Sequence, residues 1–187
     1  YGAQIRQAVS RSQRERAFMP LLNRAAELQD EVSGWRRHLH AHPELMFDVH
    51  DTAAFVTDKL RAFGCDEVVT GLGRTGVVGV IKGNRGEGET IGMRADMDAL
   101  PIHEATDVPH KSTIAGKMHA CGHDGHMAIL LGAAKMLMSM KDRIEGDDGR
   151  AGFRETAHEF GDAGVVCHQI GEVVGDQLFF IHLPNGA

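Results

Sequence analysis

The sequence is poor in cysteine, in aromatic residues and in long apolar runs, and each shortage excludes a class of protein. Its 187 residues include three cysteines, one tryptophan and one tyrosine. A small, odd number of cysteines does not fit a disulfide scaffold and points to a reducing compartment or a metal role. Scarce aromatic rings argue against a base-stacking platform for nucleic acid. No apolar run approaches the roughly 20 residues that a membrane-spanning helix needs.

Positive charge is also in short supply. Lys and Arg total 20 against 26 Asp and Glu, which gives a formal net charge of −6 with neutral histidines. A surface for nucleic acid or for anionic membranes needs clustered Lys and Arg, so neither partner is expected. The short apolar core of a secretory signal is not seen near the first residue, and we therefore expect a cytoplasmic location.

Histidine is the residue type that is abundant, with 12 copies. Apolar residues make up 42% of the chain and charged residues 25%, which are ordinary values for globular domains. The length suits one domain or one and a half, and is sufficient to bury a core. Because imidazole is a common metal ligand, the histidine content directs the search for motifs toward metal chemistry.

The pattern of apolar residues predicts an α/β fold. Helical spacing recurs over residues 5–41 with a break at Pro20, over 51–63, where Asp51 or Thr52 is the expected cap and Gly64 the end, and over 126–141. Strand-like composition recurs over residues 67–70, 75–82, 90–95, 165–170 and 177–182. The glycine-rich spacer from Gly83 to Gly88 predicts a hairpin turn between antiparallel strands.

The densest group of possible metal ligands lies in the segment Met118–His126, which reads Met-His-Ala-Cys-Gly-His-Asp-Gly-His. Cysteine thiolate and imidazole are frequent ligands of zinc and similar metals. Cys121 and His123 stand two residues apart, with Gly122 between them to permit a tight turn. We expect both on a loop that leads into the following helix. The alternative is a solvated loop that contains several histidines by chance.

Two other segments contain possible site residues. A predicted strand ends at Asp96 and Asp98, whose carboxylates share one side if the chain stays extended, where they could bind a metal or orient an imidazole. The alternative is a simple capping turn. His38 and His42 are four residues apart on a predicted helix, which is a possible metal pair. We favour a structural role for this pair because no general-base Glu lies between them and Pro43 ends the helix.

Three motifs occur together in a distinctive order: Arg36 to Leu45, Met93 to Pro101 and Met118 to His126. Together they resemble the metallo-amidohydrolase family of hippurate hydrolase, N-acyl-amino-acid hydrolases, auxin-conjugate hydrolases and aminobenzoyl-glutamate hydrolase, over about residues 25–145. The resemblance implies a three-layer α/β sandwich, with a mixed central sheet and helices on both faces. It also implies an N-terminal helical extension over residues 1–24 and a partial catalytic domain over 25–187, without the family's lid and dimerisation domain.

The resemblance further implies a site for two divalent metal ions with Cys, His, Glu, His and a last His as ligands. Cys121 and His123 match the first two. Glu159, 38 residues after Cys121, and His182, 23 residues after Glu159, are the counterparts of the next two, with Glu155 as the alternative carboxylate. The last His would lie in a part of the family chain beyond this sequence. Zn, Mn, Co or Ni would suit such ligands.

The family reaction is hydrolysis of the amide bond in N-acyl amino acids or related small amides by a metal-activated water. By resemblance, Asp98 orients the site and Asp96 is the weaker candidate. His158 stands where the family has its general-base Glu, so the chain alone is expected to hydrolyse such substrates poorly. The alternative is a truncated metal-binding paralogue without turnover. The full-length family also implies a homodimer.

Overall fold

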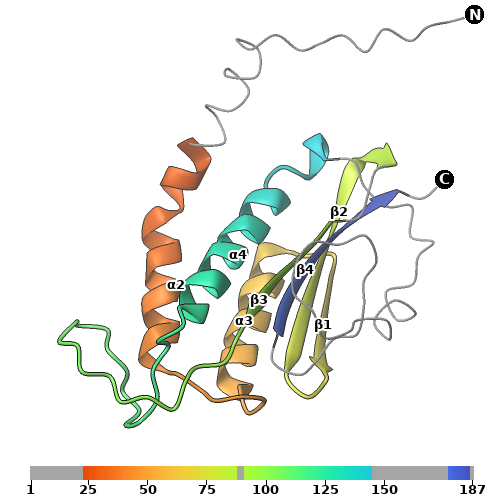
Figure 1. Cartoon of the computed structure of the whole chain (residues 1–187). Helices are drawn as coiled ribbons and strands as arrows, with labels where there is room; N and C mark the ends of the chain where they lie inside the picture. The colour runs from red at the N-terminus through yellow and green to blue at the C-terminus, as the bar shows by residue number, and fades with distance from the viewer. Residues whose placement is uncertain (1–22, 88–90, 145–176, 186–187) are drawn as a thin grey trace, which may run out of the picture.

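The computed structural model describes residues 23–87, 91–144 and 177–185, the last of these by their backbone. Its helices and strands alternate as expected for an α/β fold (Figure 1). In chain order they are α2 (Gln29–Ala41), α3 (His50–Phe63), β1 (Glu67–Leu72), β2 (Gly76–Glu87), β3 (Ile91–Asp96), α4 (His123–Met138), the 3₁₀ turn η1 (Lys141–Arg143) and β4 (Gln177–Asn185). The helix expected before residue 23 and the strand expected over 165–170 lie outside the described residues.

The four strands form one mixed sheet in the order β1-β2-β4-β3. β1 and β2 are an antiparallel pair, β2 and β4 are parallel, and β3 and β4 are antiparallel. The mixed α/β class is thus confirmed. The predicted hairpin between β2 and β3 is wrong, because β4 lies between them and bonds to both. A pairing between segments 100 residues apart cannot be seen from the local turn composition around Gly83.

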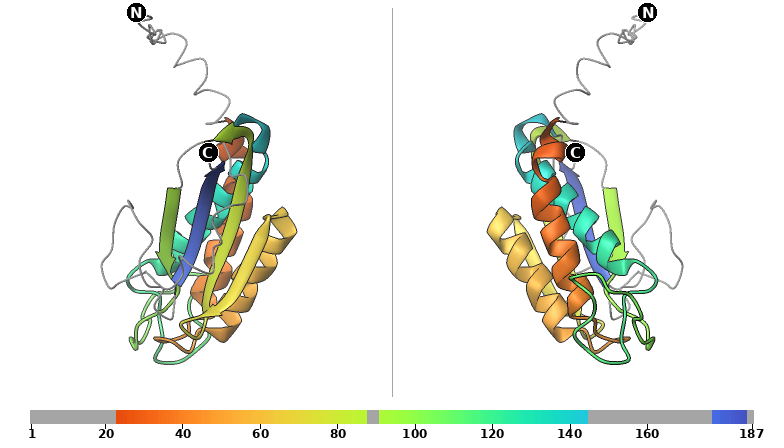
Figure 2. Two further views of the ribbon diagram at one scale, coloured as in Figure 1. Left: turned by 90° about the vertical axis from the view of Figure 1, so that its right-hand side faces the viewer. Right: turned by 90° about the vertical axis from the view of Figure 1, so that its left-hand side faces the viewer.

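The described helices lie on one face of the sheet (Figures 1 and 2). α3 packs on β1 and β2, whereas α4 packs on β2 and β3 and carries α2 on its outer side. Gly132 permits this close approach, since a Cβ atom there would lie 3.0 Å from Val32 Cγ2. The helices implied for the second face are not found among residues 23–87, 91–144 and 177–185. None of the described helices is both long enough and apolar enough to span a membrane.

The core fills the space between the sheet and the helices. Its fully buried side chains come from α3, from β2, from the segment after β3 and from α4, and include Val56, Leu60, Val77, Ile81, Met97, Met127 and Leu131. Glycines shape its edges. Gly64 adopts φ +80° and ends α3 as predicted, because glycine tolerates this left-handed conformation.

The start of α3 differs from the prediction. Neither Asp51 nor Thr52 caps the helix with its side chain, and the N-cap residue is Val49. The carboxylate of Glu44 accepts the backbone N–H groups of Asp51, at 3.2 Å, and Thr52, at 2.7 Å. An acid just outside the helix thus satisfies two donors of the first turn. Local capping rules miss it because the acceptor lies six residues before the helix begins.

Candidate metal centre

The candidate site forms where β3 ends and α4 begins. After Asp96 the chain passes through buried Met97 to Asp98, then returns twenty residues later at Met118. Leu100 and Met118 form an antiparallel bridge, with N–H to O distances of 2.9 and 3.0 Å in the two directions. This bridge brings the Met118–His126 segment alongside the end of β3, so two of the sequence motifs share one end of the sheet.

The structure brings Asp98 and His123 into direct contact. His123 Nδ1 lies 2.9 Å from Asp98 Oδ1 and 2.9 Å from the Asp98 backbone oxygen. Both acceptors require a proton on Nδ1, so in the neutral imidazole the lone pair lies on Nε2 and is available to another partner. The side chains are 17% and 23% exposed, so the pair is partly shielded from water yet open on one side. A carboxylate that fixes the tautomer of an imidazole is the usual support of a metal-binding histidine.

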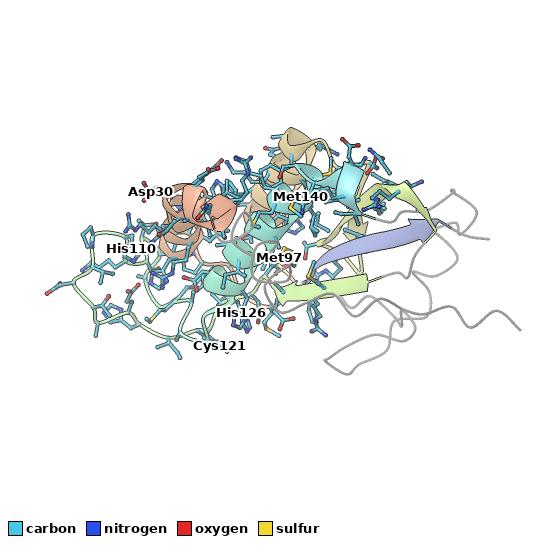
Figure 3. All side chains as sticks on the ribbon, turned by 90° about the horizontal axis from the view of Figure 1, so that it is seen from above. Asp30, Met97, His110, Cys121, His126 and Met140 are labelled. Carbon is cyan, nitrogen blue, oxygen red and sulfur yellow. The ribbon has the colours of Figure 1, made fainter. Side chains whose placement is uncertain are left out.

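Cys121 lies just before α4, and its free thiol is exposed. Gly122 follows with φ +87°, a left-handed conformation that reverses the chain and lets the helix start at once. His123 is therefore the first residue of α4, so the predicted loop position is wrong for His123 and right for Cys121. The helix starts three residues earlier than predicted because the N–H groups of Gly125 and His126 both bond to the Gly122 oxygen. In Figure 3, Cys121 and His126 lie on one side of this turn.

Asp96 and the His38–His42 pair have contacts away from the candidate site. Asp96 Oδ1 accepts a hydrogen bond from Arg94 Nη2 at 2.7 Å, so only Asp98 of the two strand-end acids faces His123. His38 and His42 stack at 4.6 Å between ring centroids, and His38 also stacks on Phe55. Burial, with His42 and Lys59 nearby, lowers the pKa of His38. An environment that disfavours a positive charge on His38 also disfavours a bound metal cation, which agrees with a structural role.

Two buried polar side chains near the site have spare bonding capacity. His119 is 3% exposed, and neither ring nitrogen has a partner among the described residues. Burial lowers the pKa of His119 to about 4, although the nearby Asp124 carboxylate opposes the shift. Asp124 is fully buried, and its Oδ1 atom likewise has no described partner. Buried polar atoms are nearly always hydrogen-bonded, so these atoms mark a place suited to a polar guest.

The donors present fit a zinc-like metal but do not complete a site. A thiolate and an imidazole Nε2 are ligands that Zn²⁺ and Co²⁺ accept readily. Within the described ranges, no group of three or more His, Cys, Asp or Glu side chains could hold an ion alone. His158, Glu159 and the alternative Glu155 lie outside the described residues. Any ion bound by Cys121 and His123 would therefore need further ligands from elsewhere.

The backbone also locates His182, the remaining sequence candidate. His182 of β4 pairs with Ile91, whereas Asp96 pairs with Gln177 at the start of β4. Gln177 and His182 are five residues apart along β4, which corresponds to about 17 Å of strand. The register thus sets the His182 backbone toward the other end of the sheet from Asp98. Its role as a ligand stays a prediction that the described register does not favour.

Four further residues beside the site were missed by the sequence analysis. Arg36, His40, Glu104 and Asp124 join in a chain of hydrogen bonds and ion pairs, which we call the Asp124 network. Arg36 and His40 are four residues apart and share a face of α2, and this spacing was the available signal. The partners Glu104 and Asp124 are 64 and 84 positions from His40, so no local pattern could connect them.

Comparisons with known proteins point to one group of hydrolases. Residues 92–164 match the model of Peptidase family M20/M25/M40. Thermostable carboxypeptidase 2 of Saccharolobus solfataricus is 47% identical over 128 residues, which are 68% of this chain and 32% of that protein. Hippurate hydrolase of Campylobacter jejuni is 50% identical over 121 residues, or 65% of this chain and 31% of that protein. This chain is related to the M20 hydrolases.

A solved M20 structure supports the relationship. The Bacillus subtilis YXEP protein, described as a dinuclear metal binding peptidase from the M20 family, superposes with a TM-score of 0.61. The sequences are 30% identical, and the match covers 84% of this chain and 35% of that one. The resemblance inferred from the three motifs is thus confirmed. The chain spans about a third of the length of the M20 relatives that it matches.

Proposed function

We propose that this chain supplies part of the metal centre of an amidohydrolase that cleaves N-acyl amino acids or related small amides. The observation that carries the proposal is the contact between His123 Nδ1 and Asp98, which leaves Nε2 available two residues after the exposed Cys121 thiol. This arrangement has the anchored imidazole that metal sites need. The M20 relatives, which include a hippurate hydrolase and a dinuclear metal binding peptidase, favour the same chemistry.

The residues have separate tasks in this proposal. Cys121 and His123 would hold a divalent ion, and Asp98 would fix the imidazole ring. The N-terminal end of α4, which begins at His123, favours negative charge that develops nearby. Bound divalent ions would lower the pKa of a water molecule and polarise the scissile carbonyl. Zn, Mn, Co and Ni all suit these ligands, and a homodimer and a cytoplasmic location stay predictions from the sequence.

The rest of the proposed site rests on sequence alone. Glu159 and His182 are the candidates for further ligands. His158 is the candidate base, in the position where the resemblance implies a carboxylate. An imidazole with an ordinary pKa near 6.5 is suited to moving a proton at neutral pH. A replaced base nevertheless typically forfeits about 10²–10⁴-fold in rate. The second candidate function, metal binding without turnover, is favoured by this substitution.

An assay of hippurate-like substrates with added Zn²⁺ or Mn²⁺ tests the proposal. We expect slow turnover by the parent chain, a faster rate for His158→Glu, and loss of turnover for Cys121→Ser. Cys65→Ser is the matched control, because burial raises the pKa of the Cys65 thiol to about 11 and keeps it protonated. Turnover that survives Cys121→Ser would contradict the proposed centre. Metal binding with no turnover, even in His158→Glu, would favour the second candidate.

A further inference from the structure

The Asp124 network joins three parts of the chain beside the candidate metal centre. Asp124, in the first turn of α4, forms through Oδ2 an ion pair with Arg36 Nε and a hydrogen bond with His40 Nδ1, each at 2.8 Å. On its other side His40 Nε2 lies 3.1 Å from Glu104 Oε1, in the loop between β3 and α4. α2 therefore connects the loop to the beginning of α4.

The loop end of the Asp124 network is itself firmly held. Glu104 accepts the backbone N–H of Ser112 at 2.6 Å and the hydroxyl of Thr106. Burial alone would raise the pKa of Glu104, but these bonds and His40 outweigh it and lower the pKa to about 2. Arg36 Nη1 donates to His110 Nε2 at 2.9 Å, which ties a second point of the loop to α2. In Figure 3, His110 lies on the loop at the α2 side of the molecule.

The Asp124 network sets two carboxylates, those of Asp124 and Glu104, against the side chains of Arg36 and His40. Carboxylate oxygens only accept, so a ring nitrogen of His40 that bonds to either one acts as the donor. Arg36 Nη2 also lies 3.3 Å from His40 Nδ1. A buried network of this kind is costly to break at one member, because its partners lose their counter-charge. It is thus a stiff connection between elements.

This connection bears directly on His123, the neighbour of Asp124 in the first turn of α4. Asp124 faces α2, whereas His123 faces Asp98, so the turn is held from two sides. The segment that continues from α2 also holds the chain next to Asp98, because the backbone oxygen of Glu44 accepts the N–H of Ala99 at 2.7 Å. One segment, residues 36–45, therefore fixes both partners of the His123–Asp98 contact. That assigns a positioning task to the motif of residues 36–45.

We propose that Asp124 is a positioning residue, which, through Arg36 and His40, holds the first turn of α4 where the His123 imidazole meets the Asp98 carboxylate. Its effect on metal binding rests on the proposed function, but its effect on the His123–Asp98 contact does not. Asp124→Asn keeps the shape of the side chain and removes its charge. Arg36→Lys keeps the charge and loses the Nε donor at a half-buried position that tolerates change.

The experiment combines two measurements on the full chain. NMR of the imidazole nitrogens in the metal-free chain reports whether Nδ1 of His123 keeps its hydrogen-bonded proton. Absorption during a Co²⁺ titration reports metal affinity. Asp107→Asn is the matched control, because its fully exposed carboxylate lies on the same loop and only faces Lys111 at 3.7 Å. Circular dichroism confirms that each variant is folded, and Arg36→Lys decides the result if Asp124→Asn does not fold.

The outcomes separate this proposal from the proposed function. We expect both variants to lose the protected Nδ1 proton of His123 and to bind Co²⁺ about 10- to 100-fold more weakly, with the control unchanged. Variants that keep the proton signal and the parent affinity would overturn the positioning role and leave the metal centre intact. A parent that binds no Co²⁺, with variants that still lose the proton signal, would overturn the metal centre and leave the positioning role standing.

Discussion

Two polar clusters lie on opposite sides of the first turn of α4, and they differ in how fully their atoms are used. In the Asp124 network, Arg36 and His40 face two carboxylates, and Glu104 accepts three hydrogen bonds. At the candidate metal centre, the Cys121 thiol and both nitrogens of His119 have no described partner. The Asp124 network also has one unpaired buried atom, Asp124 Oδ1, but its other contacts join α2, the loop and α4. The difference therefore assigns support to the first cluster and ligand binding to the second.

The largest effect should come from removing the central side chain of the Asp124 network, His40. His40→Leu leaves Asp124 and Glu104 buried and facing one another, which should cost about 3–5 kcal/mol of unfolding free energy. Urea denaturation of the metal-free chain measures it. His103→Leu is the matched control on the neighbouring loop, because its exposed ring should change stability by less than about 0.5 kcal/mol. Equal costs for the two variants would contradict the role of the network.

Acid should weaken the Asp124 network through Glu104. Its pKa is about 2 in the folded chain against 4.5 ordinarily, so the unfolded chain binds more protons between these values. The contribution of Glu104 is therefore complete above about pH 4.5 and is lost as the pH falls toward 2. Glu104→Gln should be less stable than the parent at neutral pH and lose less stability on acidification. Parallel curves of urea midpoint against pH for the two chains would show that Glu104 is not held in this way.

The next effect concerns the candidate metal centre. Asp98→Ala should weaken Co²⁺ binding about 10- to 100-fold, because the His123 ring loses the carboxylate that orients it. Asp96→Ala is the matched control, since Asp96 bonds to Arg94 rather than to His123. Isothermal titration with Co²⁺ separates the two variants. A larger loss for Asp96→Ala would mean that the other strand-end acid supports the site.

The smallest effect is the difference in stability expected between alanine substitutions at two glycines of α4. A Cβ atom at Gly125 would meet nothing within 4 Å, so Gly125→Ala should stabilise the helix by about 0.5–1 kcal/mol. At Gly132 a Cβ atom would lie 3.0 Å from Val32 Cγ2, so the same gain should be offset where α2 packs on α4. Thermal unfolding of the two variants measures the difference. A more stable Gly132→Ala than Gly125→Ala would contradict the tight packing of the two helices.

The sequence predicted the local features of this fold well and the distant ones poorly. The helix that ends at Gly64 and the adjacent strands β1 and β2 follow from periodicity and turn composition over a few residues. The insertion of β4 beside β2 and the capping of α3 by Glu44 depend on partners that no short window contains. His123 was found from the local Cys/His cluster, and the family resemblance supplied the orienting role of Asp98. His40 and Asp124 were missed because nothing in the sequence connects residues 84 positions apart.

The central claim is that Cys121 and His123 bind a metal ion together, and cobalt spectroscopy tests it most directly. Co²⁺ bound by a thiolate produces an intense charge-transfer band in the near ultraviolet, which a site built only from nitrogen and oxygen lacks. We predict that the parent chain and Cys65→Ser show this band, that Cys121→Ser loses it, and that His123→Ala weakens it together with the affinity. An unchanged band in Cys121→Ser, or its loss in Cys65→Ser, would contradict the account.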